Sequence, residues 1–119
     1  MPDGVAGEIL RRKWMIMSQA IYYVSFKLKK SASVPDFLLA AEQLNNEFIS
    51  KQKGYVSWEQ LRDGETWADV ITFETMDDLA NFEAVSRDPD ELALKFYSFI
   101  NLNSCKGHRF SVEKVMRQV

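Results

Sequence analysis

The chain has 119 residues, of which 46% are hydrophobic and 27% charged, as expected for one globular domain with a modest core. It contains no run of eighteen apolar residues, which argues against a membrane-spanning helix, and its net charge of -2 argues against a general nucleic-acid binder. The single cysteine, Cys105, excludes an intramolecular disulfide and fits a reducing compartment, so a cytoplasmic location is expected.

Residues 1–19 are interpreted as an N-terminal tail, and residues 20–119 as the folded domain. In the tail, a basic cluster at 11–13 precedes only four apolar residues, too few for the apolar region of a signal peptide. Met15 or Met17 is a candidate natural start, with the earlier residues as an upstream extension, and the tail is left out of the predicted fold.

Residues 20–28 are rich in β-branched and aromatic side chains and are apolar on both faces, which predicts a central strand. A helix is predicted next, because Ser33 and Pro35 form an N-terminal capping pattern ahead of an apolar stripe. Gly54 is the stop signal for this helix.

Two strand-like runs flank Asp63-Gly64, which is a strong hairpin signal. A two-residue turn at these positions fixes the pairing of the two strands and therefore which side chains share a face. The pairs predicted on one face are Trp58 with Asp69, Gln60 with Trp67, and Val56 with Ile71.

The last third of the chain predicts two helices and a strand. Thr75 is the expected N-cap of the first helix, and Asp88, followed by Pro89, is the expected N-cap of the second. Residues 101–107 are predicted to be a connection, and residues 108–115 to be the last strand.

The order strand, helix, strand, strand, helix, strand, with an extra helix before the last strand, predicts an α+β fold. Right-handed crossovers arrange it as a ferredoxin-like antiparallel sheet with strand order 4-1-3-2. Helices would cover one face, while the other face keeps large apolar side chains. Such a face needs a cover, so we expect a homodimer that closes a dimeric α/β barrel.

The charges are unevenly distributed along the chain. Residues 59–91 contain eleven acidic and two basic side chains, whereas the remainder contains thirteen basic and six acidic ones. One interpretation is pairing between two copies, with the acidic hairpin beside the basic last strand of the other copy. Solvated faces of opposite sign are the alternative. The basic side chains assigned to the last strand are Lys106, Arg109, Lys114 and Arg117.

Residues 20–116 resemble the dimeric α/β-barrel superfamily, especially its antibiotic-biosynthesis-monooxygenase-like members. The resemblance rests on the strand at 21–26, on Gly54-Tyr-Val-Ser-Trp-Glu59, and on the run at 73–82. It implies two sheets packed face to face, in a family that includes cofactor-independent quinone-forming monooxygenases, haem-degrading oxygenases and proteins with no known activity. Residues 77–100 lack the histidine of many family enzymes, and Phe82 stands where haem-degrading relatives place a tryptophan, which argues against haem degradation.

The polar residues on the predicted strands suggest an aromatic-lined pocket with a carboxylate for proton abstraction. One histidine and one cysteine argue against a metal site, and there is no glycine-rich phosphate loop, so no cofactor is predicted. The alternative is that these groups are structural, with a hydrogen bond between the Trp58 indole and Asp69. The catalytic candidates are Asp69, Glu59 and His108, and the substrate-binding candidates are Trp58, Trp67, Tyr22, Tyr23 and Phe82.

Two functions stay open at this point. One is a cofactor-independent monooxygenase that acts on an aromatic or polyketide-like substrate, as the resemblance implies. The other is a non-catalytic barrel that binds a small apolar ligand or serves in a stress response. In both cases the expected partners are a second copy of the chain and a small apolar or aromatic ligand, without nucleic acid or membrane.

Overall fold

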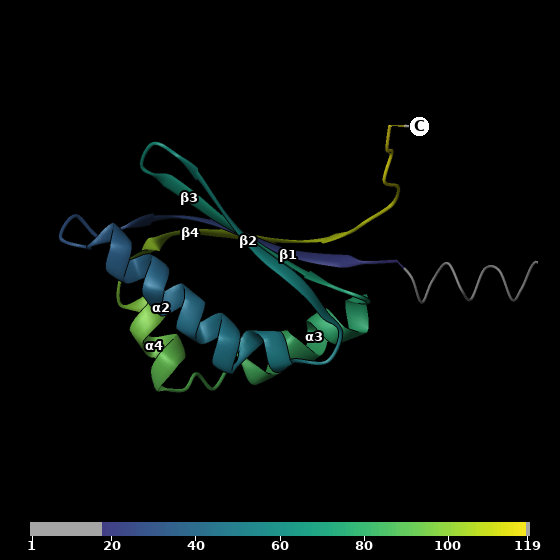
Figure 1. Cartoon of the computed structure of the whole chain (residues 1–119), viewed down its shortest axis with the longest axis horizontal. Helices are drawn as coiled ribbons and strands as arrows, with labels where there is room; N and C mark the ends of the chain where they lie inside the picture. The colour runs from purple at the N-terminus through teal and green to yellow at the C-terminus, as the bar shows by residue number, and fades with distance from the viewer. Residues whose placement is uncertain (1–17, 119) are drawn as a thin grey trace, which may run out of the picture.

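The computed structural model describes residues 18–118, which form a four-stranded antiparallel sheet with its helices on one side (Figure 1). The sheet order is β2-β3-β1-β4, which confirms the predicted ferredoxin-like α+β fold. The predicted tail lies outside the described residues apart from Ser18 and Gln19, and no described helix is long and apolar enough to cross a membrane. The elements are β1 (Ala20–Leu28), α2 (Val34–Glu47), the 3-10 helix η1 (Ile49–Lys51), β2 (Tyr55–Asp63), β3 (Thr66–Phe73), α3 (Met76–Val85), α4 (Glu91–Tyr97) and β4 (Ile100–Ser111).

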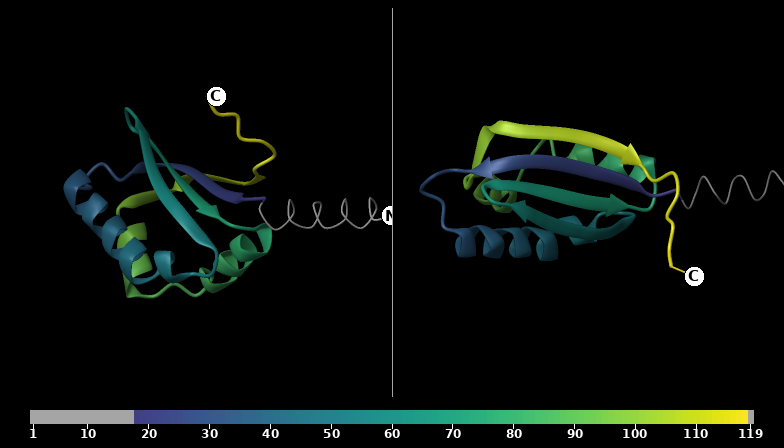
Figure 2. Two further views of the ribbon diagram at one scale, coloured as in Figure 1. Left: turned by 45° about the vertical axis from the view of Figure 1, so that its right-hand side comes forward. Right: turned by 90° about the horizontal axis from the view of Figure 1, so that it is seen from above.

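The two faces of the sheet differ in what covers them (Figures 1 and 2). On the helix face, Tyr22 of β1 meets Phe82 of α3 with ring centroids 6.2 Å apart. On the opposite side, which we call the open face, Tyr23 packs edge-on against Phe110 of β4 at 6.3 Å. Side chains alternate along a strand, so Val24 is on the same face as Tyr22. Asp69 of β3 is paired with Val24 of β1 and with Gln60 of β2, and it therefore lies on the helix face.

The core lies between the helix face and the helices, and Phe37 of α2 is at its centre. This side chain is fully buried, and its ring lies 5.3 Å from the rings of both Trp67 and Phe96. Phe26 and Phe99 complete the cluster at 5.9 Å and 6.1 Å. The Phe96 ring is stacked on Phe37 and the other three meet it edge to face, and both arrangements of aromatic rings are attractive.

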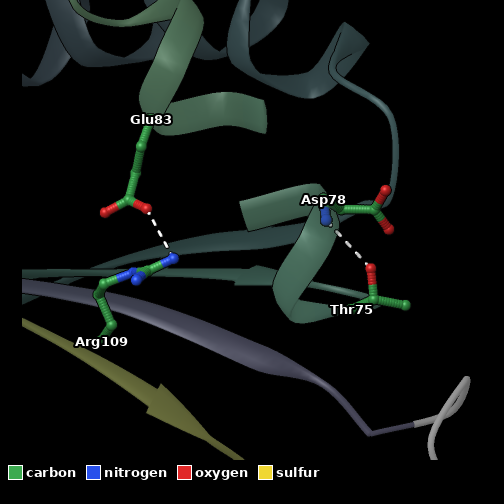
Figure 3. Close-up of polar contacts among 4 residues, drawn as sticks. All are labelled: Thr75, Asp78, Glu83 and Arg109. Atoms are coloured by element: carbon green, nitrogen blue, oxygen red, sulfur yellow. Dashed lines mark hydrogen bonds and ion pairs between the residues drawn. The ribbon is translucent and has the colours of Figure 1, made fainter. Parts of the chain in front are cut away.

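The helix caps follow the sequence closely at two of three sites. The Ser33 hydroxyl accepts from the Asp36 amide, and the Thr75 hydroxyl accepts from the Asp78 amide at 3.0 Å (Figure 3). The prediction of Asp88 as the third cap is wrong, because its amide donates to the Val85 carbonyl in the turn that ends α3. The cap is Asp90, whose carboxylate accepts from the amide of Ala93.

The first helix ends earlier than Gly54, with η1 between them. Gly54 has φ +79°, and a Cβ at this position would collide with the buried side chain of Asp78 in α3. The left-handed conformation and this close approach together require glycine. Gly54 therefore serves the junction between β2 and α3 rather than the helix end.

The hairpin has a different register from the one predicted. Its turn is Gly64-Glu65, with Gly64 at φ +61° and no positive φ at Glu65, the pattern of a type II′ turn. Moving the turn by one residue moves each cross-strand partner by two, so the side chains keep their faces. The observed pairs are Trp58 with Ile71, Gln60 with Asp69, and Arg62 with Trp67, while Val56 falls in an irregularity between Tyr55 and Ser57 and is exposed.

The last strand is longer at its start than predicted. β4 begins at Ile100, and residues 101–107 belong to it rather than forming a connection. An edge strand tolerates so polar a sequence because one of its sides is open to water. Pairing with β1 jumps between Asn101 and Lys106, and Ser104 stabilises this bulge by accepting from the Lys27 amide at 2.8 Å and donating to the Asn101 carbonyl. Because β4 ends at Ser111, Lys114 and Arg117 lie beyond it and the predicted basic strand is wrong at these two positions.

Candidate functional site

A cavity of about 420 Å³ lies between the helix face of the sheet and the helices. This volume is within the range of roughly 300–1,000 Å³ that is usual for small-molecule sites. Apolar and aromatic side chains form most of its wall, so it would hold an apolar or aromatic molecule. The titratable groups that line it are Tyr22, Asp69, Glu83, Arg87, Tyr97 and Cys105.

Asp69 is the most perturbed of these groups. It sits in the middle of β3 with only 3% of its surface exposed, and burial raises the pKa of its carboxyl to about 7. The Trp58 indole and the Gln60 amide oppose this shift by favouring the charged form. The Gln60 side chain donates to Oδ1 of Asp69 over a long 3.4 Å. A carboxyl with a pKa near neutrality can exchange a proton with a substrate at physiological pH.

Trp58 lies beside Asp69 but does not pair with it as predicted. The two residues are diagonal neighbours on adjacent strands, because Trp58 stands opposite Ile71. The indole is near enough to lower the pKa of Asp69, yet its Nε1 lacks hydrogen-bond geometry to this carboxylate. Within residues 18–118, Trp58 Nε1 is a buried donor without a hydrogen-bond partner. Its ring is held edge-on by Phe96 at 5.5 Å.

Two tyrosines and the cysteine share the cavity with Asp69. Burial raises the pKa of the Tyr22 and Tyr97 hydroxyls, and the negative charge of Asp69 adds to this in both cases. Burial and the same charge also raise the pKa of the Cys105 thiol. At neutral pH all three groups therefore keep their protons and act as hydrogen-bond donors rather than as bases.

The mouth of the cavity lies where β4 passes the end of α3, because the exposed lining residues Arg87, Leu102 and Cys105 come from these segments. Beside it, Arg109 of β4 reaches Glu83 of α3 with Nη2 and Oε1 3.0 Å apart (Figure 3). This pair is partly exposed, so it orients Glu83 more than it stabilises the fold. It also means that Arg109 points to the helix face and is paired within its own chain, while the contact of the last strand with a partner's hairpin stays a prediction.

The structure brings together only part of the predicted site. Asp69, Trp58, Tyr22 and Phe82 all line the cavity. Trp67 is on the same face but packs against Phe37, with the Arg62 guanidinium over its ring, and does not line the cavity. The remaining three predicted residues, Glu59, His108 and Tyr23, belong to the open face.

Sequence reasoning missed Tyr97 and Cys105. Tyr97 is the last residue of α4, and its side chain was not part of the apolar stripe used to predict that helix. Cys105 reaches the cavity only because β4 bulges between Asn101 and Lys106, and no residue pattern announces this bulge. Within residues 18–118, no three His, Cys, Asp or Glu side chains are grouped as a metal site.

No model of a known protein family matches the chain, and no curated protein sequence matches it either. Solved structures of similar fold do exist. A variant of SnoaB, a cofactor-independent oxygenase from Streptomyces nogalater, superposes with a TM-score of 0.67 at 12% identity, covering 84% of this chain and 98% of that one.

Two further structures agree. A protein from Nitrosomonas europaea assigned to the antibiotic biosynthesis monooxygenases gives a TM-score of 0.59 at 13% identity, covering 80% of this chain and 90% of that one. A dimeric ferredoxin-like protein from an uncultured marine organism gives 0.62 at 11% identity, covering 91% and 99%. At these identities the likeness establishes the fold alone, an α+β ferredoxin-like antiparallel sheet.

Proposed function

We propose that this protein is a cofactor-independent monooxygenase that converts a phenolic aromatic substrate to a quinone, with Asp69 as the general base. The observation that carries the proposal is a buried carboxyl with a pKa of about 7 on the wall of an apolar cavity. The similar fold of SnoaB, a cofactor-independent oxygenase, supports it. The proposal includes a cytoplasmic setting, in which Cys105 stays a free thiol.

The reaction balances without any further reductant. Asp69 takes the hydroxyl proton of the phenol, and the electron density of the phenolate at the para carbon forms a bond to one atom of O₂. Loss of the hydrogen at that carbon and cleavage of the O–O bond then give the quinone, and the second oxygen atom leaves as water. The proton held by Asp69 returns to this departing oxygen, so the carboxylate is regenerated. One phenol and one O₂ thus give one quinone and one water.

The cavity supplies what this chemistry needs from a protein. Its apolar wall excludes water from the substrate anion, which favours reaction with O₂, itself an apolar molecule. The neutral hydroxyls of Tyr22 and Tyr97 can donate hydrogen bonds to the oxygen atoms of the substrate or of the peroxide. The Phe82 and Phe96 rings give flat surfaces against which an aromatic substrate can pack.

An oxygen electrode tests the proposal directly, with 1-naphthol as the first substrate and a panel of phenols and hydroquinones after it. We expect one O₂ consumed for each quinone formed, with no hydrogen peroxide. A return of half of the oxygen on adding catalase would indicate an oxidase instead. No oxygen uptake with any member of the panel would contradict monooxygenase activity and favour a binding protein.

A non-catalytic ligand-binding protein is the second candidate, and one observation favours it. The Asp69 carboxylate already accepts a hydrogen bond from Gln60, as a structural carboxylate would. In this case the cavity would bind the same flat aromatic molecules, and calorimetry would detect binding without any oxygen uptake.

We also propose that two copies of the chain pack through their open faces. This face carries Phe110 and Leu61, which are 49% and 47% exposed, next to the half-buried Tyr23 and Val70. Apolar side chains gathered on one face usually mark an interface. The dimeric ferredoxin-like protein of similar fold supports a second copy as the occupant.

Replacing Phe110 with Asp is expected to convert the dimer to a monomer, because a carboxylate would have to be buried in the apolar contact. Sedimentation velocity at micromolar concentration measures this directly. Leu39→Asp is the matched control, since Leu39 is 53% exposed on α2, away from the open face, and its replacement should leave the dimer intact. A wild-type monomer at these concentrations would refute the interface.

A further inference from the structure

The indole N–H of Trp58 is the one buried side-chain donor in residues 18–118 that makes no hydrogen bond, although it lies near enough to Asp69 to lower the pKa of that carboxyl. Tryptophan has a single hydrogen-bond donor and no acceptor, so only an acceptor atom can satisfy this group. Buried polar groups are nearly always satisfied, and an unsatisfied one lowers stability. Because this unpaired N–H lies at the wall of a cavity, an acceptor atom of a bound ligand can form the hydrogen bond that it lacks.

The surroundings of Trp58 hold the indole still. Its ring is fixed edge-on against Phe96 and lies on the strand next to Asp69, with both residues on the wall of the same cavity. Gln60, directly opposite Asp69, uses its amide on Oδ1 of that carboxylate. The protein thus brings one hydrogen-bond donor and one proton acceptor to neighbouring points of an apolar wall.

We propose that Trp58 binds the ionisable oxygen of the substrate, the same oxygen from which Asp69 removes the proton. A phenolic oxygen fits both groups at once, because it donates its hydrogen to the carboxylate and accepts the indole N–H with a lone pair. The indole bond strengthens as this oxygen becomes negatively charged, so Trp58 favours the phenolate over the phenol. The quinone oxygen that results is still an acceptor and keeps the contact.

This inference rests on the proposed function and assigns to Trp58 the recognition of the phenolic oxygen of its substrate. An aromatic hydrocarbon of the same shape would fill the cavity but leave Trp58 unsatisfied. A phenol therefore makes two hydrogen bonds that the hydrocarbon lacks, one to Asp69 and one from Trp58, and the Trp58→Phe variant removes only the second. Specificity built on a buried polar group of this kind is stronger than specificity built on shape alone.

Binding under nitrogen tests the inference without turnover. Protein labelled with ¹⁵N at the tryptophan indoles is titrated with 1-naphthol and, separately, with naphthalene, and the Trp58 signal is assigned from the Trp58→Phe variant. We expect 1-naphthol to move the Trp58 N–H resonance downfield, while naphthalene leaves it near its free position. The Trp67 signal is the internal control, because that ring packs against Phe37 and does not line the cavity.

Calorimetry gives the second measurement. Trp58→Phe should weaken 1-naphthol binding about fivefold to tenfold, as expected for one lost hydrogen bond, and should change naphthalene binding less than about twofold. Equal losses for both ligands would mean that Trp58 contributes packing alone and would overturn the inference. A Trp58 signal that stays in place with 1-naphthol bound, or failure of 1-naphthol to bind, would overturn it too.

These outcomes are separate from those that test the reaction. Binding of 1-naphthol with the expected Trp58 shift, but without oxygen uptake from it or from any other member of the panel, would refute the monooxygenase and leave the anchoring role of Trp58 standing. Oxygen uptake from 1-naphthol with an unmoved Trp58 signal would do the reverse.

Discussion

Replacing Asp69 with Asn is expected to abolish quinone formation from 1-naphthol while leaving the fold intact. Asparagine has nearly the same shape and can still accept from Gln60, but it cannot take up a proton. A positioned general base contributes about 10²–10⁴ in rate, so the loss in kcat/KM should be at least about 100-fold. Initial rates from the oxygen electrode, with quinone absorbance in parallel, measure this loss.

The activity of the unmodified protein should depend on pH in one direction. Asp69 acts as a base only when ionised, so kcat/KM should rise with pH and level off above its pKa of about 7. Asp63→Asn is the matched control, because it removes an exposed carboxylate from the same hairpin and should leave the rate and its pH profile unchanged. A loss on Glu59→Gln or His108→Asn as large as that of Asp69→Asn would instead place the base on the open face.

Asp69→Asn should increase the free energy of unfolding at neutral and higher pH, although it abolishes the activity. The folded protein holds a proton on Asp69 up to about pH 7, whereas an unfolded aspartate releases it near its model value of 3.8. Since the folded state binds more protons between these values, the free energy of unfolding falls as pH rises from about 4 to 7, by up to about 4 kcal/mol. Asp69→Asn removes this dependence, so the variant should match the wild type near pH 4 and exceed it at pH 8.

Urea unfolding of the wild type and of Asp69→Asn at pH 4 and pH 8 measures this difference in the free energy of unfolding. A variant that is less stable than the wild type at pH 8 would show that Asp69 is stabilised as a carboxylate, contrary to the raised pKa. That result together with retained turnover would favour the structural interpretation of Asp69.

The substitution with the largest expected effect on stability is Phe37→Ala. Phe37 is fully buried and touches four other aromatic rings, from β1, β3, α4 and the segment before β4. Truncation removes these contacts and leaves a cavity that a sheet packed on helices cannot easily close. The expected cost is about 3–5 kcal/mol, a large share of the roughly 5–15 kcal/mol that stabilises a domain of this size.

Equilibrium unfolding in urea measures this cost, best at pH 5, where Asp69 is protonated and adds no strain. Leu39→Ala is the matched control on the same helix, because Leu39 is mostly exposed, and its change should be within about 0.5 kcal/mol. A Phe37→Ala variant with a loss below about 1 kcal/mol would mean that α2 does not pack on the sheet as described.

Much of the architecture was accessible from local signals in the sequence. The type and order of the main elements follow from residues with strong local preferences, such as the caps Ser33 and Thr75 and the glycine of the hairpin turn. The strand order follows from right-handed crossovers, and β1 is central because both of its faces are apolar. Asp69 was a candidate because a carboxylate in the middle of a central strand is costly unless it has hydrogen-bond donors.

Other features could not be predicted from local sequence signals. The type II′ turn moved the hairpin register, which made Gln60 the partner of Asp69 and left the Trp58 indole free. Alternation along a strand tells which side chains share a face, but only packing against α3 and α4 tells which face encloses a cavity. That decision brought Asp69, Trp58 and Tyr22 together, and it set Glu59 and His108 on the opposite side of the sheet.

The bulge in β4 is the clearest case of this kind. Its polar residues read as a connection, since nothing local favours a strand there. Pairing with β1 makes them a strand. The Ser104 hydroxyl accepts from the Lys27 amide and donates to the Asn101 carbonyl, the backbone groups at the bulge. Local preferences along the chain predict the order of the main elements, and the handedness of the crossovers then predicts the strand order, but neither predicts where β4 begins. The tertiary structure alone decided the cavity and its chemistry, because burial sets the pKa of Asp69 and depends on every element packed around it.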